Sequence, residues 1–239
     1  MKAFLLAGGR GERLRPLTLT VPKCLAPING TPLLAIWLDL LSRQGVTDVL
    51  LNISHHVEAV RAFLAAREHR APRVHLVVET QPKGSAGTVG ANRSFVADEP
   101  DFWVFYADNL TNLKLAPMLA AHRSHDGLLT MGLFHAPNPR AAGIAEVDTT
   151  GRIVGFTEKP AQPAGDLANA GIYLARRAVL DLLPARDGVV DFGHHVLPHL
   201  VGRMFGHVIE DFLMDIGTPD ALERAALAWA RRETSEITS

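Results

Sequence analysis

The residues best suited to chemistry stand near the start of the chain, in a glycine-rich loop that follows a short apolar segment. Lys2–Ala7 is predicted to form a buried strand, and Gly8, Gly9 and Gly11 follow it at once. Glycine lets the backbone turn sharply and leaves its N–H groups uncovered, and a run of such amides binds oxyanions. Fixed positive charges flank this loop at Arg13, Arg15 and Lys23. The combination predicts a site for a polyphosphate.

This loop differs from two other phosphate-binding motifs. The chain has no Gly-x-x-x-x-Gly-Lys-Ser/Thr string, so the loop is not a P-loop. A dinucleotide fingerprint that starts at Gly9 and Gly11 needs a third glycine where Leu14 stands, which disfavours a nicotinamide-dependent reductase. Taken alone, the loop has a simpler alternative, a tight strand–helix turn with solvated arginines.

Two aspartates have the chemistry to hold a divalent metal ion beside a polyphosphate. Asp108 follows the predicted strand Phe102–Ala107, and Asp215 precedes a helix that is predicted to start at Pro219. Mg²⁺ prefers oxygen ligands and keeps several waters, so one or two carboxylates suffice. The structural alternatives are a turn residue for Asp108 and a favourable charge at a helix N-terminus for Asp215.

Three further polar segments lie at the ends of predicted strands. Glu158 and Lys159 close one strand, and Asn169 opens the next. A charged hairpin end is the alternative interpretation of Glu158 and Lys159. The segment Glu79–Gly87 follows another strand and includes Ser85, which is predicted to cap the next helix.

Taken together, these segments resemble the sugar-1-phosphate nucleotidylyltransferases, also called nucleotide-sugar pyrophosphorylases. The resemblance covers the chain from Lys2 to about Leu222 and implies an enzyme that joins an NTP to a sugar 1-phosphate, releases pyrophosphate and uses Mg²⁺. It also implies an α/β fold, a three-layer Rossmann-like nucleotidyltransferase domain with a mainly parallel mixed sheet. The motifs that carry it are the glycine loop, Pro22-Lys23, Tyr106–Asn109, Glu158–Pro160, Asn169–Tyr173 and Met214–Pro219.

The resemblance assigns a role to individual residues. Arg13 would hold the β- and γ-phosphates, Lys23 the α-phosphate, and Asp108 with Asp215 the metal ion. These four and Lys159, which would hold the sugar phosphate, form the catalytic set. The other residues expected to bind the nucleotide are Ala7, Gly8, Gly9, Gly11, Glu79, Gly84 and Ser85. The other residues expected to bind the sugar are Gly143, Glu158 and Asn169.

The base and the sugar are indicated by two clues that disagree. Gly84-Ser85-Ala86-Gly87 resembles the Gly-Thr-Ala-Gly of enzymes that make GDP-sugars, and Glu79 would pair with the N–H donors of guanine. The string from Gly11 to Thr18 is similar to the muramate-1-phosphate uridylyltransferase instead. We favour GTP with a mannose- or heptose-type 1-phosphate. Uridylyl or thymidylyl transfer to another sugar 1-phosphate is the alternative, and a non-catalytic nucleotide-sugar-sensing paralogue is an alternative of another class.

These residues must be positioned by an alternating set of strands and helices. The first half has strand-like segments separated by predicted helices, which indicates a parallel sheet covered on both faces, with ligands at the carboxyl ends of its strands. We expect a single domain over residues 1–239, with a nucleotide-binding lobe to about residue 110 and a sugar-phosphate lobe with the last helix beyond it. The first-half segments are strands at Lys2–Ala7, Asp48–Ile53, Val74–Glu79 and Phe102–Ala107, and helices at Leu33–Gln44, His55–Arg70 and Ala86–Val96. Strands are expected in the second half at Leu128–His135, Gly143–Val147, Arg152–Thr157 and Asn169–Ala175.

Composition narrows the class of protein further. The 239 residues carry 24 Lys and Arg against 25 Asp and Glu, a balance that argues against nucleic-acid binding. Cys24 has no partner for an internal disulfide and is expected to pack in the core, which fits a reducing compartment. No apolar stretch approaches the roughly 20 residues of a membrane span. A cytoplasmic protein without a membrane partner is therefore expected, and a homo-oligomer is left open.

Overall fold

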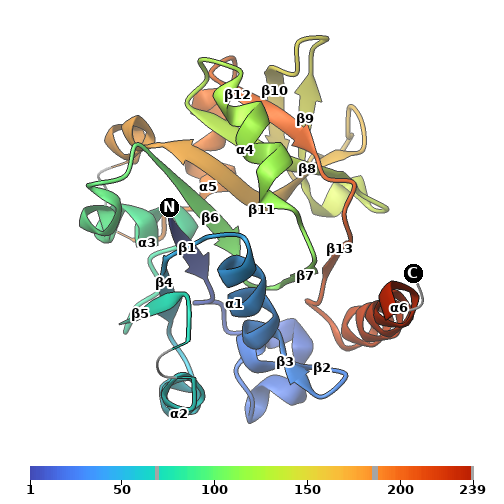
Figure 1. Cartoon of the computed structure of the whole chain (residues 1–239). Helices are drawn as coiled ribbons and strands as arrows, with labels where there is room; N and C mark the ends of the chain where they lie inside the picture. The colour runs from blue at the N-terminus through green and yellow to red at the C-terminus, as the bar shows by residue number, and fades with distance from the viewer. Residues whose placement is uncertain (68–69, 185–187, 238–239) are drawn as a thin grey trace.

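A mixed nine-stranded sheet forms the centre of the protein, and two flanking layers of helices complete the fold (Figure 1). The computed structural model describes residues 1–67, 70–184 and 188–237. Along the sheet the order is β10-β9-β11-β6-β1-β4-β5, while β8 pairs with β11 and β12. The strands are β1 Lys2–Leu6, β4 Asp48–Ile53, β5 Arg73–Val78, β6 Asp101–Tyr106, β8 Leu129–His135, β9 Gly143–Val147, β10 Ile153–Glu158, β11 Leu167–Arg176 and β12 Met204–Val208.

The first half of the chain supplies the parallel part of this sheet. Strand β1 pairs in parallel with both β4 and β6, and β4 pairs in parallel with β5. Strand β11 then runs antiparallel to β6 and to β8, which makes the sheet mixed. The carboxyl ends of β1, β4, β5 and β6 therefore meet at one edge, where the sequence predicts the ligand site.

Alternate residues of the strands face two separate hydrophobic cores. Ala3 and Leu5 of β1 lie in the first core, which packs against one layer of helices, whereas Phe4 lies in the second. Trp37 and Trp103 are buried in the first core, as their apolar surroundings in the sequence suggest. The first core includes residues of α1 Leu33–Arg43, α2 Val57–Ala65, α4 Leu115–Arg123 and α6 Pro219–Ile237. The second includes residues of α3 Ser85–Ala91, the 3₁₀ turns at Arg93–Val96 and Arg177–Leu182, and α5 Phe192–His195.

Two short two-stranded ladders lie outside the main sheet. Strand β13, Leu213–Asp215, pairs antiparallel with β7, Asn109–Thr111, and the two lie side by side in Figure 1. Helix α6 packs on the hairpin formed by β2 Pro27–Ile28 and β3 Thr31–Pro32. There Asn29 Nδ2 donates to the Ala226 carbonyl at 2.9 Å. The C-terminal helix therefore packs against the N-terminal half of the chain.

Most predicted elements are present, with differences at their ends. The first helix starts at Leu33 as predicted, with Thr31 in β3 and Pro32 before α1 without a side-chain cap. Thr218 does cap α6, since its Oγ1 accepts from the Ala221 N–H at 3.2 Å. The helix predicted over His55–Arg70 ends as α2 at Ala65, and residues 68–69 of that prediction lie outside the described residues.

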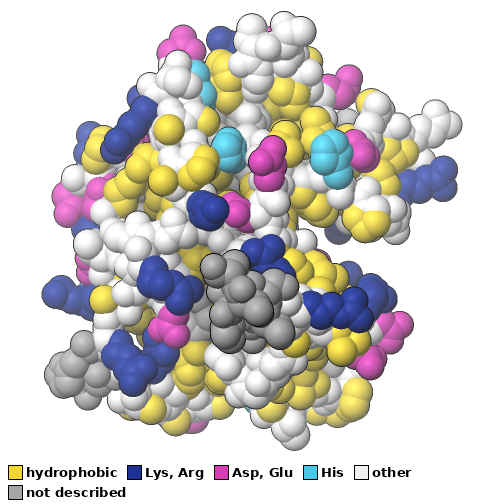
Figure 2. All heavy atoms as spheres, turned by 45° about the vertical axis from the view of Figure 1, so that its right-hand side comes forward, with side chains coloured by type: hydrophobic (Ala, Val, Ile, Leu, Met, Phe, Trp, Pro, Cys, Tyr) yellow, Lys and Arg dark blue, Asp and Glu magenta, His cyan; other side chains and the backbone are white. Residues whose placement is uncertain are grey.

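The described surface agrees with the near-neutral composition. On the face shown in Figure 2, Lys and Arg side chains are interspersed with Asp, Glu and hydrophobic ones, so its charge is mixed. Among the described residues, no helix combines the length and the apolar character that crossing a membrane requires.

Candidate active site

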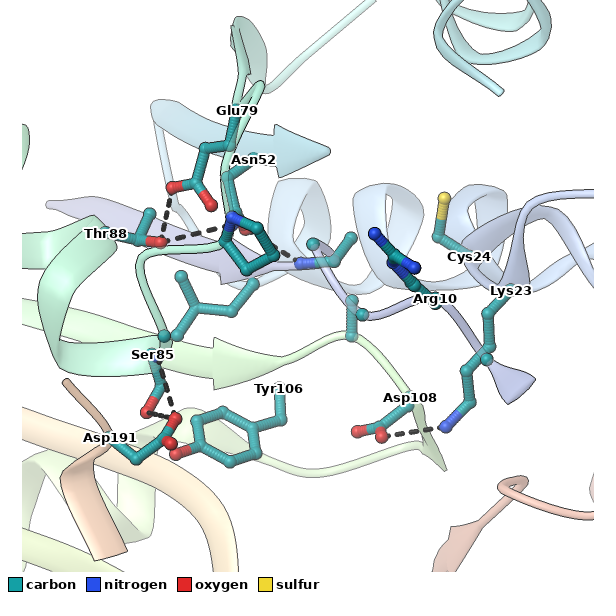
Figure 3. Close-up of a pocket in the computed structure, with 18 of the residues that line it drawn as sticks. Arg10, Lys23, Cys24, Asn52, Glu79, Ser85, Thr88, Tyr106, Asp108 and Asp191 are labelled. Atoms are coloured by element: carbon teal, nitrogen blue, oxygen red, sulfur yellow. Dashed lines mark hydrogen bonds and ion pairs between the residues drawn. The ribbon is translucent and has the colours of Figure 1, made fainter. Parts of the chain in front are cut away.

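A pocket of about 630 Å³ opens where β1, β4, β5 and β6 end. It collects residues from the glycine loop, the base-side segment and the strand ends, and Figure 3 shows how several of them lie. Glu79, Asn52 and Thr88 stand at one end, and Lys23 with Asp108 stands at the other. The predicted residues that line it are Ala7, Gly8, Gly9, Gly11, Arg13, Lys23, Glu79, Gly84, Ser85 and Asp108.

Lys23 and Asp108 form the charged end of the pocket. Lys23 Nζ lies 2.8 Å from Asp108 Oδ2, and the Lys23 side chain is only 12% exposed. Lys23 comes from a 3₁₀ turn at Lys23–Leu25, whereas Asp108 follows the central strand β6. In this ion pair each charge compensates the other, and removing either side chain would leave an uncompensated charge.

Asp215 is brought next to Asp108 by the ladder between β7 and β13. Asp215 pairs in register with Asn109, and the Ile216 N–H donates to the Asp108 carbonyl at 3.2 Å. Asp215 Oδ1 accepts the Gly217 N–H at 2.7 Å, which fixes the orientation of its carboxylate. The two aspartates are separated by more than one hundred residues of sequence and are neighbours in the fold. Asp215 itself is not among the residues that line the pocket, although Gly217 is.

Arg13 reaches the same place from the glycine loop. A Cβ at Gly217 would lie 3.0 Å from Arg13 Nη2 and 2.6 Å from Asp215 Oδ1. The backbone at Gly217 therefore lies close to both side chains, and a larger residue there would require them to shift. Arg10, which the sequence analysis did not single out, also lines the pocket and lies between its two ends in Figure 3. Arg15 does not line it and instead stands 4.0 Å from Glu12 on the exposed side of the loop.

A buried chain of hydrogen bonds forms the opposite end of the pocket. Asn52 Oδ1 accepts the Ala7 N–H at 2.9 Å, and Asn52 Nδ2 donates to Thr88 Oγ1 at 3.2 Å. Thr88 Oγ1 in turn donates to Glu79 Oε1 at 2.6 Å. Glu79 is 5% exposed, and an ionised carboxylate has about four acceptor sites, so Thr88 leaves most of them for a ligand.

Asn52 and Thr88 are functional candidates that the sequence analysis missed. Asn52 had a detectable signal, since it is a polar residue inside the otherwise apolar strand Val49–Ile53. Gly8 must stay glycine beside it, because a Cβ there would lie 2.6 Å from Asn52 Nδ2. The first glycine of the loop therefore allows the backbone to approach the base-side network closely.

Ser85 contributes to the pocket wall, although its helix is capped differently from the prediction. The N-terminal residue before α3 is Gly84, with φ 78°, and no side chain of the helix itself provides the cap. Asp191 accepts from the Ser85 N–H at 3.2 Å and also lines the pocket. No local sequence pattern points to Asp191, which is 106 residues away from Ser85.

Tyr106 joins this wall to the residues expected to bind the sugar. Its ring packs edge-on against Tyr173, with centroids 5.9 Å apart, and burial raises the pKa of Tyr106 to about 12. Tyr173 Oη accepts from Asn169 Nδ2 at 2.7 Å. Burial also raises the pKa of Tyr173, so both phenols stay protonated and act as neutral hydrogen-bonding groups.

Glu158 lies between two glycines beyond Tyr173. A Cβ at Gly143 or at Gly193 would lie 2.5 Å from Glu158 Oε2 in each case. Gly143, which is expected to bind the sugar, therefore lies against the Glu158 carboxylate. Lys159 follows with φ 48°, and its N–H donates to the Ala142 carbonyl at 3.1 Å. Gly143, Glu158, Lys159 and Asn169 are not among the residues that line the pocket.

Cys24 lies at the edge of the pocket without the properties of a nucleophile. It is 4% exposed, and burial raises the pKa of its thiol to about 12. A thiol with that pKa carries almost no thiolate at neutral pH. Cys24 therefore serves packing, as expected.

The donor set at Asp108 and Asp215 suits a hard divalent cation. In the described part of the chain, no group of three or more His, Cys, Asp and Glu side chains is arranged to enclose a metal ion. Mg²⁺ differs from zinc in this respect, because it is bound through one or two carboxylates while waters and substrate phosphates complete its octahedron. Two adjacent aspartates beside a pocket lined by Arg10, Arg13 and Lys23 match that requirement.

The fold and this arrangement define a class of protein, a mixed α/β sheet with a charged pocket at the carboxyl ends of its parallel strands. The family model described as "Nucleotidyl transferase" matches residues 2–232, and the chain belongs to that family. A probable mannose-1-phosphate guanylyltransferase of Oryza sativa is 34% identical over 92% of this chain and 62% of its own length. A mannose-1-phosphate guanylyltransferase of Mycobacterium tuberculosis is 32% identical over 94% of this chain and 63% of its own.

The chain therefore spans somewhat less than two thirds of these two relatives. Among solved structures, a putative glucose-1-phosphate thymidylyltransferase from Bacillus anthracis has a similar fold, with a TM-score of 0.84 at 23% identity. That comparison covers 95% of this chain and 94% of the other. It confirms the predicted α/β fold with a mixed, partly parallel central sheet.

Proposed function

We propose that this protein transfers a nucleotidyl group from an NTP to a sugar 1-phosphate and releases pyrophosphate. The observation that carries the proposal is the meeting of Lys23, Asp108 and Asp215 at one end of a pocket that starts at a glycine loop. The lobe before about residue 110 would bind the nucleotide, and later segments would bind the sugar phosphate. Mg²⁺ is the proposed cofactor, held by Asp108 and Asp215.

The proposed reaction is an in-line displacement at the α-phosphorus. A phosphate oxygen of the sugar 1-phosphate forms a new bond to the α-phosphorus, and the bond from that phosphorus to the oxygen bridging to the β-phosphate breaks. The nucleophile is already an anion, so no general base is needed, and catalysis consists of positioning and charge neutralisation. Bound Mg²⁺ would supply positive charge to the phosphate oxygens.

Residues of the pocket and of the later strand ends can share the remaining work. Lys23 would leave Asp108 for the α-phosphate, where its charge opposes the negative charge that builds in the transition state. Arg13, next to Gly217, would bind the leaving pyrophosphate through its planar fork. Lys159 would hold the phosphate of the sugar, while Glu158 and Asn169 would accept from and donate to the sugar hydroxyls.

Guanine is the base we favour. The Watson–Crick edge of guanine presents two N–H donors, whereas uracil and thymine present one between two acceptors. Glu79 offers a buried carboxylate in the pocket with acceptor capacity beyond its bond to Thr88. The guanylyltransferase relatives support the same base and a mannose-type sugar phosphate. A uridylyl- or thymidylyltransferase remains the alternative to be tested.

The proposal is tested by incubating the protein with Mg²⁺, each of four NTPs and a panel of sugar 1-phosphates. Pyrophosphate release would be followed by a coupled assay and the products by mass spectrometry. We expect turnover, with GTP and mannose 1-phosphate or a related heptose 1-phosphate preferred at least tenfold over other pairs. The absence of turnover with every pair, together with tight binding of a nucleotide sugar, would contradict the proposal and favour a sensing paralogue.

A further inference from the structure

One short segment, residues 190–193, contacts both the start of α3 beside the pocket and Glu158, which is expected to bind the sugar. Val190 O accepts the N–H groups of Ala86 and Gly87, each at 2.9 Å, and the Val190 N–H donates to Lys83 O at 2.8 Å. The start of α3 and the loop before it are therefore fixed to a segment about one hundred residues later in the chain. These backbone bonds form the wall that lies beside Glu79 and Ser85.

Asp191 and Ser85 complete this connection by capping each other's helices. Asp191 Oδ1 accepts from the Ser85 N–H at 3.2 Å and from Ser85 Oγ at 3.3 Å. Ser85 Oγ accepts the Phe192 N–H at 2.9 Å, at the first residue of α5. Each side chain thus bonds a backbone N–H that the other helix leaves without an intrahelical partner. The trio of Ser85, Asp191 and Tyr106 is visible in Figure 3.

The same segment continues to the residue expected to bind the sugar hydroxyls. Gly193 stands two residues after Asp191, and a Cβ there would lie 2.5 Å from Glu158 Oε2 and 3.0 Å from Glu158 Cδ. The Glu158 carboxylate therefore rests directly on the backbone of α5. A displacement of α5 would move the surface that supports Glu158.

We propose that Asp191 is a positioning residue that couples the choice of nucleotide to the choice of sugar phosphate. Its carboxylate holds the Lys83–Gly87 loop against α5, and α5 holds Glu158, so the two subsites keep a fixed mutual geometry. The inference rests on the proposed nucleotidylyltransferase function. Losing a helix cap lowers the equilibrium constant for forming the capped structure by a factor on the order of 2 to 30. Because Asp191 supports both subsites, its loss should weaken binding at both.

Steady-state kinetics of Asp191→Ala, Asp191→Asn and Ser85→Ala test this role. Asp191→Ala should raise the KM for the NTP and the KM for the sugar 1-phosphate each about tenfold, while kcat stays within threefold. It should also reduce the discrimination between GTP and UTP. Asp191→Asn keeps an oxygen that accepts from Ser85, so it should restore both KM values to within threefold of the wild type.

A double-mutant cycle separates the cap from general damage. Asp191→Ala and Ser85→Ala each remove one cap and both remove the bond between Ser85 Oγ and Asp191 Oδ1. If the two caps act together, the loss in the double variant should be smaller than the sum of the two single losses. Asp148→Ala is the matched control, because the Asp148 carboxylate also accepts backbone N–H bonds, from Thr150 and Arg152, in a turn away from the pocket. It should leave both KM values unchanged.

Two results would overturn the inference. One is an Asp191→Ala variant whose KM rises for only one substrate or for neither. The other is an Asp191→Asn variant as impaired as the alanine variant, which would mean that the charge acts on the ligand directly. If Asp191→Ala fails to fold, Asp191→Asn and Ser85→Ala provide the same comparison. A wild-type protein without turnover would refute the proposed function. The role of Asp191 would then be judged by the same comparison of variants made with dissociation constants for the NTP and for the sugar 1-phosphate, and unchanged constants in Asp191→Ala would overturn it.

Discussion

Lys23 and Asp108 illustrate how single residues prepare the pocket for a charged substrate. In the free protein they neutralise each other at 2.8 Å, with Lys23 nearly buried. Under the proposed function the arriving nucleotide brings phosphate oxygens for Lys23 and a metal ion for Asp108, so each charge exchanges one partner for another. This exchange avoids the large penalty of leaving a buried charge unpaired at any stage.

Glu79 is expected to set the choice of base. In Glu79→Gln the amide oxygen can still accept from Thr88, but the NH₂ group then faces the pocket as a donor. The two N–H donors of guanine would then face the NH₂ donor of the glutamine. A carbonyl oxygen of uracil would instead gain that NH₂ as a hydrogen-bond donor. We predict that the ratio of kcat/KM for GTP over UTP falls by about 10²- to 10³-fold, because buried donors are left unpaired.

The measurement is a competition between the two nucleotides with one sugar 1-phosphate. Thr88→Val, which removes the hydroxyl that holds Glu79 and keeps the shape of the side chain, should cause a smaller loss in the same direction. An unchanged ratio in Glu79→Gln would exclude Glu79 from base recognition.

Elements far apart in sequence build the site, and this limits what the sequence could predict. The carboxyl ends of Lys2–Ala7, Val74–Glu79 and Phe102–Ala107 were expected at one edge, because long apolar strands alternating with helices indicate a parallel sheet. The structure brings them together there. Strand β13, in contrast, has three residues and no periodicity, so its pairing with β7 could not be predicted.

Side-chain partners were less predictable than strands. The loop motif indicated phosphate chemistry. Which of Arg10 and Arg15 lines the pocket depends on the direction in which each part of the loop faces, and the motif does not contain that information. Asp191 caps a helix about one hundred residues earlier, and a local pattern contains no information on such a contact. The metal-binding and substrate-binding roles of the individual residues stay predictions.

The packing of α4 on β8 includes two histidines that make stability depend on pH. Thr130 Oγ1 lies 2.7 Å from His122 Nδ1 and 2.8 Å from His125 Nε2, and the Gly127 N–H donates to His125 Nδ1 at 3.1 Å. Burial lowers the pKa of both, that of His125 to about 4, and the nearby Arg176 acts in the same direction. The carboxylates of Asp101, toward His122, and of Asp126, toward His125, oppose this shift.

Because the folded state binds these protons less tightly than the unfolded state, stability is complete above the unfolded pKa, near 6.5. It is lost as the pH falls from about 6.5 towards about 4. We predict a melting temperature that declines over this window more steeply in the wild type than in His125→Gln. The difference should correspond to less than roughly 1.4 kcal/mol per pH unit, because His125 is partly exposed. Parallel melting curves for the two proteins would contradict this assignment.

For the molecule as a whole, the two hydrophobic cores share one sheet and should unfold together. Phe4 and Leu5 are neighbours in β1 yet belong to different cores, so one core cannot lose its strands without disrupting the other. The C-terminal helix adds to this linkage, since it packs on the hairpin around Asn29. A single domain over residues 1–239 is therefore still our prediction.

Chemical denaturation can test that prediction with two signals. The three tryptophans all belong to or pack against the first core, so their fluorescence reports on that core, while far-ultraviolet circular dichroism reports on the whole chain. We expect the two signals to change at the same urea concentration, as a cooperative transition requires. Two separated midpoints would show independent units.

The central claim is that residues from opposite ends of the chain converge on one metal-dependent catalytic centre. The most direct measurement is ³¹P NMR of GTP, mannose 1-phosphate and Mg²⁺ with the wild type, Asp108→Asn and Asp215→Asn, with melting temperatures recorded in parallel. We predict nucleotide-sugar and pyrophosphate signals with the wild type, and rates at least about 10³-fold lower in both variants, with melting temperatures little changed. A rate within threefold of the wild type in either stable variant would contradict the account.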